Sequence, residues 1–259
     1  MSVRAKRELG QHFLADDNIL GVIDRLAQLR GDDVVLEVGP GLGVLTTFLA
    51  DRVDRVHAVE LDRSLEPELR NALARRPNVR LHFGDALQLD LAALEPAPTK
   101  LVANLPYNIA TPLVVESLDG LPTVQVWCVM VQREVADRFF ATAGTKDYGG
   151  VSVLVQLAAE RSGFHPVSRH VFRPRPNVES ALVAFSRRGA LPPDYARVKQ
   201  VVESAFAHRR KTLPNSLELA GVAARDDASA ALEQLGRGPS TRAEALSPDE
   251  FVALARALS

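Results

Sequence analysis

The stretch Val34-Val35-Leu36-Glu37-Val38-Gly39-Pro40-Gly41-Leu42-Gly43 decides the fold of this chain. Its first five residues form a short apolar run of the kind found in buried strands, and the alternating glycines lead into the helix-compatible residues 44–51. A strand, a glycine loop and a helix, in this order, open a doubly wound α/β sheet, where the loop receives a nucleotide or nucleoside. The sequence therefore predicts an open, mostly parallel sheet with a ligand at the carboxyl ends of its strands.

The glycine spacing indicates which ligand this loop receives. A dinucleotide fingerprint needs its third glycine at the position that Val44 occupies. The pattern here is instead Glu37 followed by Gly39, Gly41 and Gly43, which favours S-adenosylmethionine over NAD. An NAD-dependent oxidoreductase is also disfavoured because the chain has no evident set of hydride-transfer residues. We expect Gly39 and Gly41 to contact the cofactor.

Two carboxylates follow the next predicted strands. The strand at 56–59 ends at Glu60, twenty-one residues beyond Gly39, where a carboxylate can accept hydrogen bonds from both ribose hydroxyls. The strand at 79–83 is followed by Gly84 and Asp85, and Asp85 is placed to accept from the adenine amine of the cofactor. An isolated Gly-Asp pair is also a common turn, so the assignment of Asp85 depends on the neighbouring motifs.

The strand at 100–103 ends in Asn104-Leu105-Pro106-Tyr107, a loop suited to an exocyclic amine. Pro106 prevents the strand from continuing, and Thr111-Pro112 predicts the N-cap and first turn of a helix. The Asn104 carboxamide oxygen and a main-chain carbonyl beside Pro106 can accept both protons of an amine such as adenine N6. This arrangement favours a pyramidal nitrogen whose lone pair is free to attack. Tyr107 can stack on a flipped-out base.

The second half of the chain predicts the end of the sheet and then a helical tail. Further strands are expected at 124–131, 164–167 and 180–185, with helices at 133–140 and 151–159. Prolines exclude the connector 172–178 from the sheet, so it should form an extended lip near the pocket. We expect Phe172 to stack on the target base opposite Tyr107, the alternative being a core phenylalanine that anchors the lip.

A composition change at 187–193 predicts a linker between two domains. We expect an α/β domain at 1–188, whose first residues form a basic leader, and a small all-helical domain at 189–259. The helices predicted in the tail are 195–206, 213–219, 228–235 and 248–258.

The composition restricts the class of protein. A chain of 259 residues, 46% of them hydrophobic, has enough apolar material for one large and one small domain. A single cysteine, Cys128 in an apolar strand, excludes a disulfide within the chain and predicts a buried thiol. The histidines show no metal-ligand spacing, so we expect no metal. No apolar run approaches a membrane span, and no signal-peptide pattern begins the chain, so we expect a cytoplasmic protein.

A net charge of −1 argues against a uniformly basic nucleic-acid binder, so RNA contacts must come from local patches. We expect Arg173 and Arg175 of the lip, together with Arg209, Arg210 and Lys211 of the tail, to bind RNA phosphates. Arg4, Lys6 and Arg7 form a further basic group at the beginning of the chain.

Several motifs together resemble the KsgA/RsmA family of ribosomal RNA adenine dimethyltransferases. They are Gln11-His12-Phe13-Leu14, the stretch 37–43, Asn104 to Ile109, Gln132 to Ala136, Phe172 to Val178, and His208 to Leu213. The tail pattern Arg242 to Ser247 fits as well, so the resemblance covers nearly the whole chain. Glycine loops recur across class I methyltransferases, but these other motifs in this order are specific to the family.

The resemblance implies a class I S-adenosylmethionine-dependent fold, with a Rossmann-like seven-stranded sheet and a small C-terminal helical domain. It implies N6,N6-dimethylation of two adjacent adenosines in the 3′-terminal hairpin of small-subunit rRNA during subunit assembly, with S-adenosylhomocysteine as product. The residues that match the family's cofactor contacts are His12, Leu14, Gly39, Glu60, Asp85 and Asn104, and those that match its adenine pocket are Asn104, Leu105, Pro106, Tyr107 and Phe172. We expect a monomer that acts on the assembling small ribosomal subunit.

Two other functions remain open on the sequence. Large-subunit rRNA adenine methyltransferases that confer macrolide resistance carry a similar Asn-x-Pro-Tyr loop, although the stretch 208–213 is more similar to the small-subunit group. A ribosome-assembly or RNA-binding factor, in which methyl transfer is incidental, would also fit the basic patches.

Overall fold

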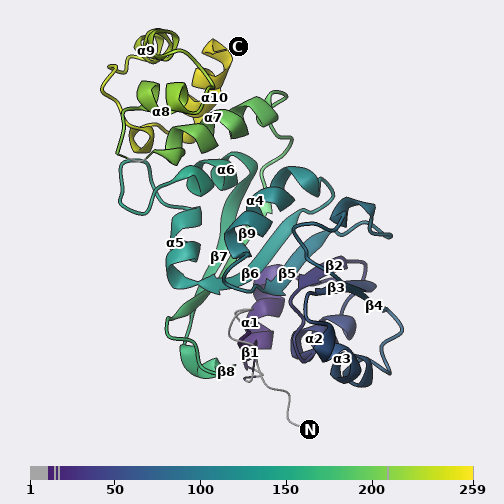
Figure 1. The fold of residues 1–259 in the computed structure, drawn as a ribbon. Helices are drawn as coiled ribbons and strands as arrows, with labels where there is room; N and C mark the ends of the chain where they lie inside the picture. The colour runs from purple at the N-terminus through teal and green to yellow at the C-terminus, as the bar shows by residue number, and fades with distance from the viewer. Residues whose placement is uncertain (1–10, 15, 17, 209, 259) are drawn as a thin grey trace. The chain divides into compact units, whose positions relative to one another are not determined.

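The structure is a computed structural model that describes residues 11–14, 16, 18–208 and 210–258. The chain divides into two compact units: residues 1–136 with 161–187, and residues 137–160 with 188–259. The first unit carries the sheet, and the second is built mainly from helices (Figure 1).

The described residues form one seven-stranded sheet in the order β4-β3-β2-β5-β6-β9-β7. Its strands are β2 Val34–Val38, β3 Arg55–Glu60, β4 Val79–Phe83, β5 Lys100–Asn104, β6 Val126–Gln132, β7 Ala159–Val167 and β9 Ser180–Arg187. Neighbours from β4 to β6 run parallel, and β9 is antiparallel to β6. This order confirms the predicted doubly wound sheet. The order reverses at β2, with β3 on one side and β5 on the other, and such a switch point is where doubly wound sheets bind ligands.

Helices accompany the sheet and form the tail (Figure 1). The first part of the chain contains α1 Asn18–Ala27, α2 Val44–Ala50, α3 Glu66–Ala72, α4 Ala110–Gly120 and α5 Arg133–Phe139. Then follow α6 Gly150–Ala158, α7 Tyr195–Ala207, α8 Leu213–Leu219, α9 Arg225–Gln234 and α10 Pro248–Ala257. Among the described residues, no helix is long and apolar enough to cross a membrane.

Both faces of the central strands are covered, which explains why these strands are apolar along their length. On one face, Val35, Val102 and Met130 pack with α1 and α2 in a single buried cluster. On the other face, the Trp127 indole donates a hydrogen bond to Ser117 of α4 (2.8 Å) and stacks on Phe185 of β9. Cys128 is buried as predicted, and burial raises the pKa of its thiol to about 12.

The second unit has its own core. Phe251 of α10 is fully buried beside Phe206 of α7, and the Tyr148 hydroxyl donates to the Leu246 carbonyl (2.8 Å). The Gly144 amide donates to the Glu244 carbonyl (2.7 Å). These contacts join the chain around residues 137–160 to the tail, and α6 packs on α7 and α10.

Two local features differ from the sequence predictions. Helix α4 begins at Ala110 with Ile109 as its N-cap, so Thr111 lies inside the first turn and not at the cap. A separate two-stranded sheet joins β1 (Phe13–Leu14) to β8 (Phe172–Arg173), whereas no strand was expected in either segment. The lip prolines begin only at Pro174, so the amides of β8 remain available for this pairing.

We predict that Lys100→Met destabilises the sheet unit by about 3–5 kcal/mol. The ammonium group of Lys100 is buried, lies 2.7 Å from Asp33 and also donates to the Ala27 carbonyl at the end of α1. Its removal leaves the Asp33 carboxylate buried without its partner. Urea unfolding followed by the fluorescence of Trp127, the one tryptophan of the chain, measures the loss in this unit.

The matched control is Arg70→Met, which breaks the exposed ion pair between Glu66 and Arg70 on α3. It should change the free energy of unfolding by less than about 0.5 kcal/mol. An effect of Lys100→Met no larger than that of the control would show that the buried pair does not stabilise the sheet.

Candidate active site

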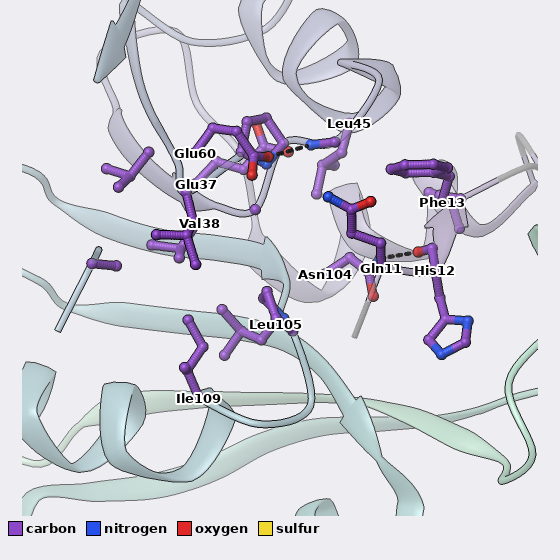
Figure 2. A pocket seen from close by; sticks show the side chains of 18 of the residues that line it. Gln11, His12, Phe13, Glu37, Val38, Leu45, Glu60, Asn104, Leu105 and Ile109 are labelled. Atoms are coloured by element: carbon purple, nitrogen blue, oxygen red, sulfur yellow. Dashed lines mark hydrogen bonds between the residues drawn. The ribbon is translucent and has the colours of Figure 1, made fainter. Parts of the chain in front are cut away.

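A pocket lies at the carboxyl ends of β2, β3 and β5 (Figure 2). It is lined by residues of the segments 11–14, 37–42, 44–45, 59–61, 84–86 and 104–109. All seven residues predicted to contact the cofactor line it: His12, Leu14, Gly39, Gly41, Glu60, Asp85 and Asn104. Leu105, Pro106 and Tyr107 line it as well, so the expected cofactor and target loops share one cavity.

The glycine loop needs its glycines for conformation and for space. Gly39 and Gly41 have φ values of 77° and 59°, which side chains rarely adopt. A Cβ on Gly39 would lie 3.1 Å from the Pro106 ring, and one on Gly41 would lie 2.8 Å from the Phe13 ring. The loop therefore packs directly against the Asn104 loop on one side and against the segment 11–14 on the other.

Glu60 bridges two main-chain turns at the end of β3 (Figure 2). Its Oε2 accepts from the Gly41 amide (3.2 Å) and its Oε1 from the Asp62 amide (2.8 Å). Burial raises the pKa of the Glu60 carboxyl, and the amides of Asp62 and Gly41 partly offset that rise. Each carboxylate oxygen keeps a second lone pair, so Glu60 can still accept from ligand hydroxyls.

Glu37, buried in β2, is a second carboxyl in this pocket that the sequence reasoning treated only as part of a motif. Burial raises its pKa to about 8, the Glu60 carboxylate adds to this rise, and Thr46 opposes it. Apart from its proximity to Thr46, Glu37 Oε2 is buried without a hydrogen-bond partner among the described residues. A lone glutamate inside a wholly apolar strand was the signal in the sequence. An uncompensated carboxyl facing a pocket fits a cationic ligand.

The main chain fixes the orientation of the Asn104 carboxamide. Its Nδ2 donates to the His12 carbonyl (3.0 Å), so Oδ1 is the atom left to accept from a ligand. The Pro106 carbonyl is already bound by the Ile109 amide (3.1 Å), whereas the Leu105 carbonyl accepts no hydrogen bond from the described residues. Two acceptors of this pocket-lining loop, Asn104 Oδ1 and the Leu105 carbonyl, therefore have no hydrogen-bond partner among the described residues.

Tyr107 is held by two contacts that the sequence did not indicate. Its hydroxyl lies 2.7 Å from the hydroxyl of Ser180, the first residue of β9. Its ring centroid lies 5.5 Å from that of His12, whose Nδ1 donates to the Pro174 carbonyl (2.8 Å). In Figure 2 the His12 ring points away from the Glu37 and Glu60 carboxylates.

Phe172 does not reach the pocket. Its side chain is only 2% exposed and belongs to the core cluster that contains Leu14, its partner in the β1–β8 pairing. The structure therefore places Phe172 as a core residue that anchors the lip, and not as a stacking partner for a base opposite Tyr107.

The predicted phosphate-binding residues are exposed where the structure describes them. Arg173 and Arg175 are exposed on the lip of the first unit, and Arg210 and Lys211 are exposed in the second unit. Arg209 and the basic group Arg4, Lys6 and Arg7 lie outside the described residues. No group of three or more His, Cys, Asp or Glu side chains in the described part of the chain is arranged to hold a metal ion.

Two solved structures resemble this fold. A dimethyladenosine transferase from Plasmodium falciparum matches with a TM-score of 0.75 at 23% identity, over 94% of this chain and 96% of that one. The 23S rRNA methyltransferase ErmE matches with a TM-score of 0.66 at 30% identity, over 95% of this chain and 99% of that one. Both support the predicted class I methyltransferase fold.

Sequence comparisons identify the family. The chain is 51% identical over 256 residues to the ribosomal RNA small subunit methyltransferase A of Rubrobacter xylanophilus, covering 99% of this chain and 96% of the relative. It is 42% identical over 264 residues to the protein of the same name in Geobacter metallireducens, with the same coverage. A family model described as ribosomal RNA adenine dimethylase matches residues 2–258. The chain therefore belongs to the ribosomal RNA adenine dimethylase family, as its motifs indicated.

Proposed function

We propose that this protein uses S-adenosylmethionine to dimethylate N6 of two adjacent adenosines in the 3′-terminal hairpin of small-subunit rRNA, during assembly of the small subunit. The observation that carries the proposal is the pair of free acceptors, Asn104 Oδ1 and the Leu105 carbonyl, beside a pocket with two buried carboxyls. The names of the relatives from Rubrobacter and Geobacter support the small subunit as the site of action.

The pocket residues fit S-adenosylmethionine, which supplies an electrophilic methyl group on a sulfonium when it is bound. Glu60 would accept from the ribose hydroxyls, and Asp85 from the adenine amine. Gly39 and Gly41 allow the ligand to approach the main chain, and His12 and Leu14 close the pocket from the N-terminal side. Burial raises the pKa of Glu37, and the positive charge of this ligand would favour the carboxylate form.

On the substrate side, Asn104 and Leu105 accept the two N–H groups of adenine N6 while Tyr107 stacks on the flipped-out base. The N6 lone pair attacks the methyl carbon, the carbon–sulfur bond breaks, and its electron pair remains on sulfur to give S-adenosylhomocysteine. The methylated N6 is cationic and loses its proton to water. Alignment of nucleophile and methyl group can supply about 7–11 kcal/mol of barrier reduction, so the loop needs no strong base.

The second transfer begins with one N–H on N6, so one of the two acceptors loses its donor. The pocket must then accommodate the first methyl group by rotation of the amine. Phosphates of the rRNA would be held by Arg173 and Arg175 of the lip and by Arg209, Arg210 and Lys211 of the tail. We propose that the chain acts as a cytoplasmic monomer on the assembling particle and not on free RNA.

A second candidate function is methylation of large-subunit rRNA, because ErmE, named as a 23S rRNA methyltransferase, covers 95% of this chain at 30% identity. The relatives named for the small subunit are more similar in sequence, at 42% and 51% identity. We therefore favour the small subunit.

We predict that the protein transfers labelled methyl groups to undermethylated small subunits, and that mass analysis places two of them on each of two adjacent adenines. Asn104→Ala should abolish most transfer in both rounds, because it removes an acceptor that no other side chain replaces. Its binding to the particles should persist, since the loop is supported by main-chain bonds of Leu105 and Ile109.

Label found only in large subunits would establish the alternative substrate. Near-normal dimethylation by Asn104→Ala would contradict the role of the carboxamide. Wild-type binding to small subunits without transfer to any RNA would instead indicate an assembly factor.

We predict that Glu60→Gln weakens S-adenosylmethionine binding roughly 10- to 150-fold, equivalent to about 1.5–3 kcal/mol for the loss of a charged acceptor. The change keeps the size of the side chain, but the Gln carboxamide can accept from only one of the Gly41 and Asp62 amides, so unfolding of the variant is measured alongside binding. Calorimetry on folded protein measures the affinity. Glu66→Gln on α3, outside the pocket, is the control and should bind normally; equal affinity in both variants would exclude Glu60 as a ribose ligand.

We predict that S-adenosylmethionine binding at pH 7 releases close to one proton. Glu37 is mostly protonated at pH 7 because its pKa is about 8, and a cationic ligand favours its carboxylate form. Affinity should therefore rise with pH, by about fivefold from pH 7 to 8 and by about tenfold in all, and level off above the pKa. Calorimetry in two buffers of different ionisation enthalpy counts the protons.

The matched variant Glu37→Gln should bind without this proton release. A binding enthalpy that is independent of the buffer in the wild type would contradict the linkage. Release that persists in Glu37→Gln would assign the proton to another group, with Glu60 the nearest candidate.

A further inference from the structure

The lip (172–178) contacts His12 beside Tyr107, and Ser180, the first residue of β9, contacts Tyr107 itself. At the beginning of the lip, the Pro174 carbonyl accepts from His12 Nδ1 (2.8 Å), and the His12 ring lies beside Tyr107. Just beyond the lip, the Ser180 hydroxyl lies 2.7 Å from the Tyr107 hydroxyl. The segment from which a stacking phenylalanine was expected therefore holds another aromatic ring.

Ser180 occupies a rigid position. It is 1% exposed, it pairs with Gln132 across the ladder between β6 and β9, and the preceding Glu179 carbonyl accepts from the Arg133 amide (3.0 Å). Its hydroxyl is thus placed by the sheet. Tyr107, in contrast, lies in an irregular loop and is only partly buried.

The two contacts restrain different movements of the Tyr107 ring. The hydroxyl lies on the long axis of the ring, so its bond to Ser180 fixes where that axis points but allows rotation about it. The His12 ring, inclined by 34° at 5.5 Å, limits that rotation by packing. Burial raises the pKa of the Tyr107 hydroxyl, so it remains protonated and able to share a hydrogen with Ser180.

We propose that Ser180 is a positioning residue for methyl transfer, whose hydroxyl pins the far end of Tyr107 so that the ring presents a fixed face to the target adenine. This inference rests on the proposed function, because it requires a base against Tyr107. Ser180 itself touches neither the cofactor pocket nor the base: it acts through Tyr107. A side chain that is fixed by supporting hydrogen bonds keeps its position more precisely than a side chain on an unsupported loop.

The test is single-turnover methyl transfer to undermethylated small subunits, with cofactor and particles saturating. Ser180→Ala should lower the rate by about 2- to 10-fold, the value of one hydrogen bond, with unchanged cofactor affinity. Tyr107→Phe keeps the ring but loses the same bond, so it should show a similar fall. The double variant should be no slower than either single variant, because both changes remove one interaction.

The matched control is Ser117→Ala. Ser117 is another buried serine of the same unit, bonded to Trp127 and to the Val114 carbonyl, and it does not line the pocket. This variant should lose stability but keep the transfer rate per folded molecule. A normal rate in Ser180→Ala, or a double variant slowed by the product of the two single effects, would overturn the positioning role.

A measurement without substrate separates this inference from the proposed function. In protein carrying ¹³Cζ-labelled tyrosine, the resonance absent from Tyr107→Phe belongs to Tyr107, and the other two tyrosines serve as internal references. That resonance should shift in Ser180→Ala and not in Ser117→Ala. An unshifted Tyr107 resonance would refute the hydrogen bond whether or not the protein methylates RNA, whereas a wild type that is inactive on every RNA would refute the proposed function alone.

Discussion

The close approach of Gly39 to Pro106 is the constraint on which the site depends. The glycine loop after β2 and the Asn104 loop after β5 follow adjacent parallel strands. A side chain at residue 39 would be strained at a φ of 77°, and its Cβ would lie in a tight contact, 3.1 Å from the proline ring. Methyl transfer needs donor and acceptor atoms in line at short range. The absence of one side chain therefore sets the distance between the glycine loop and the Asn104 loop, the two walls that we propose hold the cofactor and the target base.

The two buried carboxyls of the pocket differ in their main-chain surroundings. Two carboxyls, Glu37 and Glu60, are buried at the ends of neighbouring strands, and burial raises the pKa of each. Main-chain amides support Glu60, while Glu37 lacks comparable hydrogen bonds. This difference matches the roles that we propose, in which Glu60 holds hydroxyl groups and Glu37 responds to a positive charge. This division arises from the backbone around each residue, since the side chains are chemically identical.

The sequence predicted the strands of the sheet and the residues that follow their carboxyl ends. Apolar runs located the central strands within one or two residues, and Glu60 and Asn104 were identified because parallel strands bring their carboxyl ends to one edge. Contacts between distant short segments could not be predicted: two-residue strands such as β1 and β8 carry no periodicity, and nothing marks Ser180 as the partner of Tyr107. An aromatic residue in a proline-rich lip suits a pocket or a core equally well. The position of Phe172 in the core could therefore be seen only in the structure. Residues 137–160 belong to the same compact unit as the tail, and no local pattern in the sequence indicates this.

The pairing of β1 with β8 determines when the pocket can be completed during synthesis. Phe13, which covers the glycine loop, pairs with Arg173, so these two partners leave the ribosome 160 residues apart. The sheet strands β2 to β6 can associate earlier, but until the lip has emerged the segment 11–14 has no β8 partner and His12 has no Pro174 carbonyl to bind. If strands β2 to β6 associate while the chain is being synthesised, the pocket remains open on the side of residues 11–14 until β8 has emerged.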